Sequence, residues 1–196
     1  MPTRMALFAD AHGHVDLLYK ALEVCRHAQV NEIVLLGDLI DRDDQADACA
    51  RAFADFSVSG VFGNHEQQLM DALTMGADLG LRRETIDLFM TLKEHIIVDN
   101  VCFCHDGPPQ LNRDEIDLLF FNPASAPQVS PYHVVFSGHT HFRHVRDERG
   151  HIELAANALT IRPHRRYRIN PGALTAGQFA IWDREASVVR FHTVRP

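Results

Sequence analysis

The chain contains 196 residues, 46% of them hydrophobic and 23% charged, which suffices for one well-filled domain and is too few for two ordinary ones. Its formal net charge of −7 excludes a global basic field that would attract nucleic acid or an anionic membrane surface. No apolar stretch approaches the roughly 20 residues that a membrane helix needs, and the first residues do not resemble a secretory signal. We therefore expect one cytoplasmic domain over residues 1–196.

The first half of the chain alternates short apolar runs with segments whose apolar residues recur at helical spacing. The runs are too short for helices and are typical of buried strands. Strands are predicted at residues 5–9, 33–36 and 58–62. Helices are predicted from Val15 to about Cys25, from the capping residues Asp43 and Asp44 to about Phe53, up to about Leu73, and from Leu81 to Leu92.

The second half is predicted to be mostly β-structure. Residues 96–98 and 101–104 flank Asp99-Asn100, which is typical of a hairpin turn. Cys102 and Cys104 share one face of the second of these strands, where we expect them to be buried and reduced. Further strands are predicted at residues 132–136, 143–146, 152–154, 178–183 and 187–193. An α/β first half and a β-rich second half indicate two stacked sheets with helices outside.

A proline-rich segment at residues 108–132 carries one predicted helix at 114–121. We interpret this segment as a mobile wall of a binding site. Its aromatic residues Phe120, Phe121 and Tyr132 have two interpretations, a surface for a base or an aryl group and ordinary core packing. The two interpretations are equally favoured by the sequence.

Polar motifs end five of the predicted strands, the position where open α/β sheets place their chemistry. Thirteen histidines in the chain add to this signal, and five of them fall in these motifs. Mixed oxygen and nitrogen donors suit Mn²⁺, Fe²⁺ or Zn²⁺ better than Ca²⁺. Asp38 follows Gly37 at a strand end and is our candidate for a carboxylate that bridges two cations. The candidate donors are Asp10, His12, Asp38, Asn64, His105, His139 and His141.

The ordered motifs resemble those of the calcineurin-like metallophosphoesterases over nearly the whole chain. The motifs are Asp10-x-His12, Gly37-Asp38-x-x-Asp41-Arg42, Gly63-Asn64-His65-Glu66, His105 and Gly138-His139-x-His141. The short chain and the segment Ile169-Asn170-Pro171-Gly172 are similar to the small bacterial and archaeal phosphodiesterase branch. The resemblance implies an α/β fold, a four-layer α-β-β-α sandwich of two mixed sheets flanked by helices.

The same resemblance implies a role for each motif residue. It assigns His65 as the proton donor to the leaving oxygen, with Asp41 orienting it, because imidazole chemistry is suited to proton transfer near neutral pH. Arg42 and Asn64 would contact the substrate phosphate, although an ion pair of Arg42 with Asp43, Asp44 or Glu66 is the alternative. One metal would be held by Asp10, His12, Asp38 and His141, and the other by Asp38, Asn64, His105 and His139.

Some residues depart from the family pattern. His14 stands where Asn is usual, and Ala173 stands where Ser is usual. Asp106 follows His105 where a small or apolar residue is common, and its charge would either tighten metal binding or repel a phosphate dianion. A basic cluster lies between the last metal motif and Asn170, and it consists of Arg162, His164, Arg165, Arg166 and Arg168. A solvated surface is the favoured interpretation of such a charge run. The alternative is a returning loop that brings a guanidinium to a second phosphate.

These features predict a dinuclear phosphoesterase that hydrolyses a phosphate ester by in-line attack of a metal-bridging hydroxide, with His65 as general acid. Phosphodiesters, nucleotides or dinucleoside polyphosphates are the favoured substrates. The alternatives are a phosphomonoesterase similar to serine/threonine protein phosphatases and, less favoured, a non-catalytic metal-binding scaffold. We expect two divalent transition-metal ions, Mn²⁺ first, with Fe²⁺, Fe³⁺, Zn²⁺ and Ni²⁺ as alternatives. The expected partner is a small phosphorylated substrate, with no membrane and no stable nucleic-acid partner; a homo-oligomer is left open.

Overall fold

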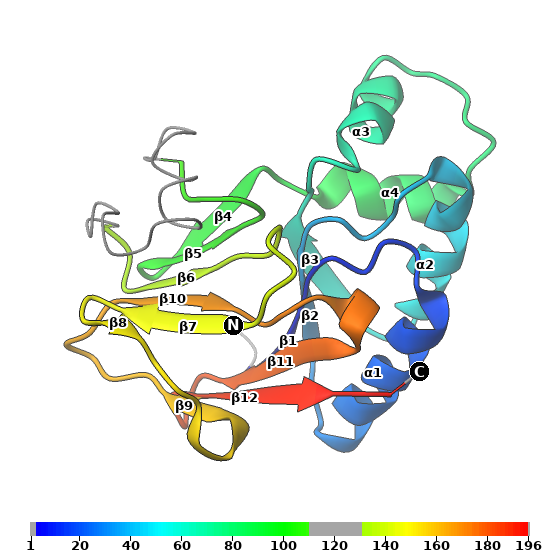
Figure 1. Ribbon diagram of the computed structural model, residues 1–196. Helices are drawn as coiled ribbons and strands as arrows, with labels where there is room; N and C mark the ends of the chain where they lie inside the picture. The colour runs from blue at the N-terminus through cyan, green and yellow to red at the C-terminus, as the bar shows by residue number, and fades with distance from the viewer. Residues whose placement is uncertain (1–2, 110–130, 196) are drawn as a thin grey trace.

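The computed structural model describes residues 3–109 and 131–195, and within them two six-stranded sheets stack against each other (Figure 1). The first sheet has the order β3-β2-β1-β11-β12-β9 and the second has the order β4-β5-β6-β10-β7-β8. The strands of the first sheet are β3 (Ser57–Val61), β2 (Glu32–Leu36), β1 (Arg4–Phe8), β11 (Gln178–Asp183), β12 (Val188–Thr193) and β9 (Ala158–Thr160). Those of the second are β4 (His95–Val98), β5 (Val101–Cys104), β6 (Val134–Phe136), β10 (Tyr167–Asn170), β7 (His144–Asp147) and β8 (Gly150–His151).

Both sheets are mixed, as predicted. In the first sheet β1, β2 and β3 run parallel, and β11, β12 and β9 add antiparallel partners. In the second sheet β5, β6 and β10 run parallel, while β4, β7 and β8 pair antiparallel. The carboxyl ends of β1, β2, β3, β5 and β6 therefore carry the five predicted motifs.

β1 and β2 are nearly continuous apolar runs because both of their faces are buried. On β1, Ala6 and Phe8 face the helices, whereas Met5 and Leu7 face the second sheet. Because successive side chains of a strand point to opposite faces, β1 contributes residues to two separate cores. The second of these cores, between the sheets, also contains Trp182 of β11.

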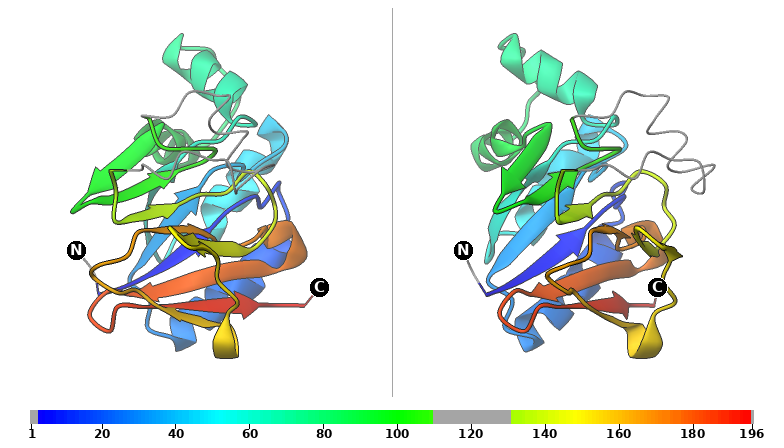
Figure 2. Two further views of the ribbon diagram at one scale, coloured as in Figure 1. Left: turned by 60° about the vertical axis from the view of Figure 1, so that its left-hand side comes forward. Right: turned by 90° about the vertical axis from the view of Figure 1, so that its left-hand side faces the viewer.

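Helices α1 (Val15–His27), α2 (Ala46–Ala52) and α4 (Arg83–Thr91) lie beside the first sheet, and α3 (Gln67–Thr74) lies at the end where the motif loops emerge (Figures 1 and 2). Leu18 and Leu22 of α1 and Phe89 of α4 are fully buried against this sheet. Among the described helices, none has the length and apolar character needed to cross a membrane. The fold class, two mixed sheets flanked by helices, is as predicted; the predicted helix at 114–121 lies outside the described residues.

Several predicted elements differ from the structure. Asp43 and Asp44 do not cap α2, because they form a 3₁₀ turn before it. The side chain of Gln45 fixes this turn instead, accepting hydrogen bonds from the backbone N–H groups of Asp41 at 2.8 Å and Arg42 at 3.1 Å. The loop that enters α2 is thus held by an amide rather than by the predicted carboxylates.

The strand predicted at residues 152–154 is also wrong, since the short strand β8 ends before Ile152. β9 and β10 were not predicted. β10 was missed because Arg168 and its basic neighbours resemble a solvated charge run, yet Tyr167 and Ile169 alternate into the core between the sheets. All four cysteines are buried and free, as expected for reduced thiols.

Three aromatic rings join the two sheets across their interface. The rings of Phe103 and Phe136 in the second sheet are stacked with centroids 5.4 Å apart. The Trp182 ring of the first sheet lies 5.1 Å from Phe136. Such pairs stabilise a core beyond the area that they bury.

We predict that Phe136→Ala lowers the free energy of unfolding by about 3–5 kcal/mol, because the fully buried ring leaves a cavity between the sheets. Urea unfolding followed by circular dichroism measures this loss. Ile97→Ala is the matched control, since Ile97 lies in the same sheet but is 49% exposed. Comparable losses in the two variants would contradict the central role of the aromatic contact.

Candidate metal centre

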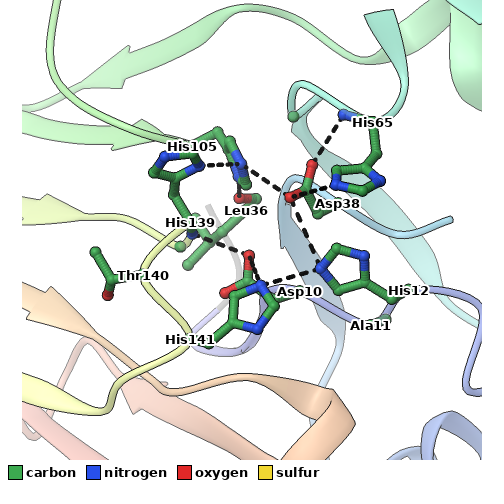
Figure 3. A network of polar contacts seen from close by, with 12 residues as sticks. Asp10, Ala11, His12, Leu36, Asp38, His65, His105, His139, Thr140 and His141 are labelled. Carbon is green, nitrogen blue, oxygen red and sulfur yellow. Dashed lines mark hydrogen bonds and ion pairs between the residues drawn. The ribbon is translucent and has the colours of Figure 1, made fainter. Parts of the chain in front are cut away.

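The five motif loops meet at one edge of the two stacked sheets (Figure 3). Within the first sheet, the backbone N–H of Asp10 donates to the carbonyl of Gly37 at 3.1 Å. Within the second, the N–H of Gly138 donates to the carbonyl of His105 at 2.9 Å. Between the sheets, the N–H of His139 donates to Asp10 Oδ1 at 2.9 Å. Backbone hydrogen bonds thus connect the loops within each sheet, and the Asp10 side chain connects the two sheets.

Five of the seven predicted metal ligands have a positive φ. The angles are 53° at Asp10, 46° at His12, 52° at Asp38, 69° at His139 and 60° at His141. This left-handed conformation is uncommon outside glycine and tends to occur at functional sites. It turns each side chain sharply at the end of its strand, which is how residues from separate strands reach one centre.

The ligand atoms of Asp10, His12, Asp38 and His141 all lie within 4.8 Å of one another. His12 Nε2 lies 3.0 Å from His141 Nε2 and 3.8 Å from Asp38 Oδ2. Asp10 Oδ1 lies 3.9 Å from His141 Nε2. The structure thus brings together the four residues that were predicted to share one metal.

A second group consists of Asp38, His105 and His139, whose ligand atoms also lie within 4.8 Å of one another. His105 Nε2 lies 3.2 Å from Asp38 Oδ2 and 3.1 Å from His139 Nδ1. It also lies 3.2 Å from the amide oxygen of Asn64, the fourth residue predicted for this metal. Asp38 belongs to both groups, which is the position that a bridging carboxylate requires.

Hydrogen bonds fix which nitrogen of two imidazoles is available as a donor to a metal. His105 Nδ1 lies 2.8 Å from the carbonyl oxygen of Leu36, which can only accept, so Nδ1 carries the hydrogen and donates it. His12 Nδ1 contacts Asp41 Oδ1 in the same way. In both rings the remaining nitrogen, Nε2, faces the ligand group. Metal-binding histidines are commonly oriented by such partners.

The electrostatics of the site fit a divalent cation. Asp10 is fully buried, and burial raises its pKa to about 6. Within the described part of the chain, its Oδ2 atom has no hydrogen-bond partner. Burial disfavours the charged form of His105, but its hydrogen bond to Asp38 raises its pKa to about 9. A bound cation would satisfy the Asp10 oxygen and take the place of the His105 proton.

His65 and Asp41 lie beside the two donor groups. His65 Nδ1 is 3.1 Å from Asp41 Oδ1, and His65 Nε2 is 4.0 Å from Asp38 Oδ2. The side chain of His65 is 38% exposed. It therefore borders the centre without belonging to either predicted ligand set, as the proton-donor role requires.

Arg42 forms a bidentate ion pair with Asp44, with both nitrogen–oxygen distances at 3.0 Å. Of the alternatives considered for Arg42, the structure contains the pair with Asp44. Both side chains are about two-thirds exposed, and solvent screens such exposed pairs so that they add little to stability. Such a pair can exchange for a phosphate, so the phosphate-binding role stays a prediction.

Glu66 is a fully buried carboxylate whose role was missed at the sequence level. It accepts three backbone hydrogen bonds, from Asp38 at 2.9 Å, Ile40 at 3.1 Å and Gly63 at 2.7 Å. Burial raises its pKa, and these N–H groups oppose that effect. Glu66 therefore ties the loop after β2 to the loop after β3. Its place beside His65 in the motif was the only sequence signal.

Asn170 has the corresponding role in the second sheet. Its side-chain N–H₂ donates to the carbonyl of Gly138 at 2.7 Å and to Thr140 Oγ1 at 3.1 Å. Its side-chain oxygen accepts from the N–H of Gly172 at 2.8 Å. This fully buried residue holds the loop that carries His139 and His141. The Asn-Pro-Gly segment is visible in the sequence, but the contacts of the Asn170 side chain cannot be predicted from it.

Close packing around Asp38 and His105 explains two glycines of the motif set, Gly37 and Gly63. A Cβ at Gly63 would lie 2.1 Å from Asp38 Oδ1 and 2.6 Å from its backbone nitrogen. At Gly37, φ is 87° and a Cβ would lie 2.4 Å from His105 Nδ1. Only hydrogen fits at these two positions without displacing a predicted ligand.

The aromatic-wall hypothesis is wrong for Tyr132, because this residue is 6% exposed and packs with Cys102, Cys104 and Val135. Phe120 and Phe121 lie outside the described residues. Among the departures from the family pattern, His14 Nδ1 hydrogen-bonds the carbonyl of Ala11 at 3.0 Å. The exposed Asp106 accepts the N–H of Gly107 at 2.7 Å.

The alternative in which the basic cluster approaches the site is also wrong. The cluster leads into β10, which runs parallel to β6, with Tyr167 opposite Val134 and Ile169 opposite Phe136. Arg162 and its neighbours therefore lie at the opposite end of the second sheet from Gly138. There, Arg165 pairs with Asp147 at 2.7 Å.

We predict that Glu66→Gln lowers the free energy of unfolding by about 1–3 kcal/mol, because the amide leaves one of three buried N–H groups without an acceptor. It should also weaken Mn²⁺ binding, since the backbone of Asp38 is no longer fixed. Chemical unfolding and calorimetric metal titration measure the two effects. Glu23→Gln, the same change on the exposed face of α1, is the control and should alter neither quantity.

Comparisons with known proteins agree with this geometry. Residues 4–194 match the calcineurin-like phosphoesterase superfamily domain. An uncharacterised protein of Methanocaldococcus jannaschii is 24% identical over 87% of this chain and 75% of its own. The crystal structure of a metallophosphoesterase from Sphaerobacter thermophilus superposes with a TM-score of 0.68 at 20% identity, covering 100% of this chain and 89% of that one. An archaeal phosphodiesterase has a TM-score of 0.58 at 16% identity, covering 97% and 99%. The predicted enzyme class, a metal-dependent phosphoesterase, is confirmed, and the chain belongs to the calcineurin-like phosphoesterase superfamily.

Proposed function

We propose that this protein hydrolyses small phosphate esters, preferentially phosphodiesters, nucleotides or dinucleoside polyphosphates, with two divalent cations, Mn²⁺ first. The observation that carries this proposal is the pair of donor groups that share Asp38, with His65 and Asp41 beside them. One cation would be held by Asp10, His12, Asp38 and His141, and the other by Asp38, Asn64, His105 and His139. When bound, such a pair of cations polarises phosphoryl oxygens and lowers the pKa of coordinated water.

The residues of the chain then set the geometry of the reaction. Asp38 would keep the two cations at the short separation that suits an in-line displacement at phosphorus. Asn64 and Arg42 would orient the phosphoryl oxygens, Arg42 after exchanging Asp44 for the substrate. A planar guanidinium matches the two oxygens of a phosphate as well as those of a carboxylate.

His65 would donate a proton to the leaving oxygen. Its Nδ1–H donates to Asp41 Oδ1 at 3.1 Å, so the proton that would be transferred to the leaving oxygen is the one on Nε2. That nitrogen lies on the side of Asp38, where the phosphoryl group would be bound. Protonation prevents the build-up of a free alkoxide, and such acid catalysis contributes typically 10²–10⁴-fold.

An exposed aromatic residue supports a substrate that carries a base or an aryl group. Phe142 directly follows His141 and is 77% exposed. The side chain of the next residue, Arg143, donates to the carbonyl of Pro171 at 2.9 Å and also contacts the carbonyl of His192, which anchors the chain next to Phe142. A solvent-exposed ring next in sequence to a candidate ligand is available for stacking on a nucleobase. The similarity to a protein named as a phosphodiesterase points to the same substrate class.

The proposal predicts hydrolysis of phosphodiesters in the presence of Mn²⁺, with a lower kcat/KM for phosphomonoesters. His65→Ala should lower kcat about 10²–10⁴-fold for a diester with an alkyl leaving group and much less for one with a nitrophenolate leaving group, which needs little protonation. Steady-state kinetics on the two diesters, with metal content measured in parallel, tests both statements.

Asp38→Asn serves as the inactive control, because it removes the carboxylate common to both donor groups. Preference for monoesters would favour the phosphatase alternative, and no hydrolysis of any ester by the metal-loaded protein would favour the scaffold. Equal losses on the two diesters in His65→Ala, or loss of metal from that variant, would refute the proton-donor role.

Phe142→Ala should raise the KM for nucleotide diesters roughly 5- to 150-fold, because stacking on a base is worth about 1–3 kcal/mol. The KM for a dialkyl phosphate should not change, since that substrate has no ring. Tyr19→Ala removes another exposed aromatic residue, 44% exposed on α1, and provides the control. An unchanged KM for nucleotides in Phe142→Ala would exclude the stacking surface.

A further inference from the structure

A single oxygen of Asp41 contacts two histidines with different expected roles. Asp41 Oδ1 lies 3.1 Å from Nδ1 of His65 and is also in hydrogen-bond contact with Nδ1 of His12. The two imidazole rings pack edge to face, with centroids 4.6 Å apart and an interplanar angle of 86°. Asp41, His12 and His65 thus form a third group of potential ligand atoms, all within 4.8 Å of one another, on the border of the two donor groups that share Asp38.

We propose that Asp41 is a positioning residue for the metal ligand His12 as well as for His65, so that one carboxylate couples metal affinity to proton donation. This inference rests on the proposed function, because it assigns His12 to a cation. The resemblance to the family attaches Asp41 to His65 alone, and the contact with His12 comes from the tertiary structure.

The chemistry follows from the hydrogen-bonding capacity of the groups. A carboxylate can only accept, and one of its oxygens has lone pairs for two N–H donors. Both imidazoles therefore place their hydrogen on Nδ1. For His12 this leaves the lone pair of Nε2, the atom that lies 3.0 Å from His141 Nε2 within the first donor group.

The surroundings of Asp41 hold it in this position. Its backbone N–H donates to Gln45 Oε1 at 2.8 Å, which fixes the loop. Among the residues that the structure describes, the charged or titratable side chains that face its carboxylate are His12, His65 and Arg42, and the guanidinium of Arg42 is paired with Asp44. The Asp41 carboxylate is thus available to accept hydrogen bonds from the two imidazoles.

The two donor groups should respond differently when Asp41 is changed. In the first group, Asp41 sets the tautomer of His12. In the second, the carbonyl of Leu36 sets the tautomer of His105 and does not depend on Asp41. Loss of such an orienting partner typically costs about 10–100-fold in metal affinity. Asp41→Ala removes the oxygen that both imidazoles contact. It should therefore weaken one cation site and leave the other unchanged.

Calorimetric titration of the metal-free protein with Mn²⁺ tests this expectation. The wild type and His65→Ala should bind two ions with similar affinities. Asp41→Ala should bind one ion as the wild type does and the other about 10–100-fold more weakly. The double variant Asp41→Ala/His65→Ala should match Asp41→Ala, which would show that the effect does not pass through His65.

A second measurement does not depend on any variant. In the zinc-loaded wild type, nitrogen-15 NMR of the histidine side chains should show the hydrogen of His12 on Nδ1 and coordination through Nε2. Two unchanged affinities in Asp41→Ala, or coordination of His12 through Nδ1, would overturn the inference. The protein could also show this selective weakening of one cation site and yet have no esterase activity. That result would support the inference and refute the proposed function.

Discussion

The position of the Asp38 carboxylate is the constraint on which the rest of the centre depends. One of its oxygens accepts the backbone N–H of His65 at 3.1 Å, and the other lies 3.2 Å from His105 Nε2. Its own backbone N–H is bound by Glu66. Burial would raise the pKa of Asp38, but its hydrogen bond to His105 contributes most to a net lowering. Both donor groups are built around this ionised side chain.

The stacking of the two sheets provides the remaining donors. Asp10 and Asp38 follow parallel strands of the first sheet, whereas His105 and His139 follow parallel strands of the second. Apolar cores fill the two faces of the first sheet, and the donor groups lie at the edge where the strands end. There, Glu66 holds the loops of the first sheet and Asn170 those of the second. Two buried polar side chains thus stabilise the loops that cannot be stabilised by regular pairing.

The distribution of charge favours cations as the groups that neutralise a phosphate. The chain has a net charge of −7, and Asp10, Asp38 and Asp41 lie together at the centre. Arg42 is compensated by Asp44, and the basic loop before β10 lies at the far end of the second sheet. Within the described residues, the centre is therefore rich in carboxylates and imidazoles. A dianionic substrate would approach it far more easily once divalent cations are bound.

Much of this protein was determined by local sequence patterns. Apolar periodicity predicts the strands β1, β2, β5 and β11 and the helix α1. The spacing of apolar residues that are close in sequence is enough to indicate which face of a strand or helix is buried. The donor residues could be predicted for the same reason, since each follows a strand end. The order of these motifs along the chain also sufficed to identify the family.

Only the tertiary structure decided how these residues interact. Asp10 and His139 are 129 positions apart, and the pairing of their loops depends on how the two sheets stack. The three amides held by Glu66, the burial of Tyr132 and the distance of the basic loop from the site likewise depend on neighbours from remote segments. The sharing of Asp41 by His12 and His65 belongs to the same class. Sequence periodicity specifies which face of an element is buried, whereas contacts between loops depend on the register of strands far apart in the chain.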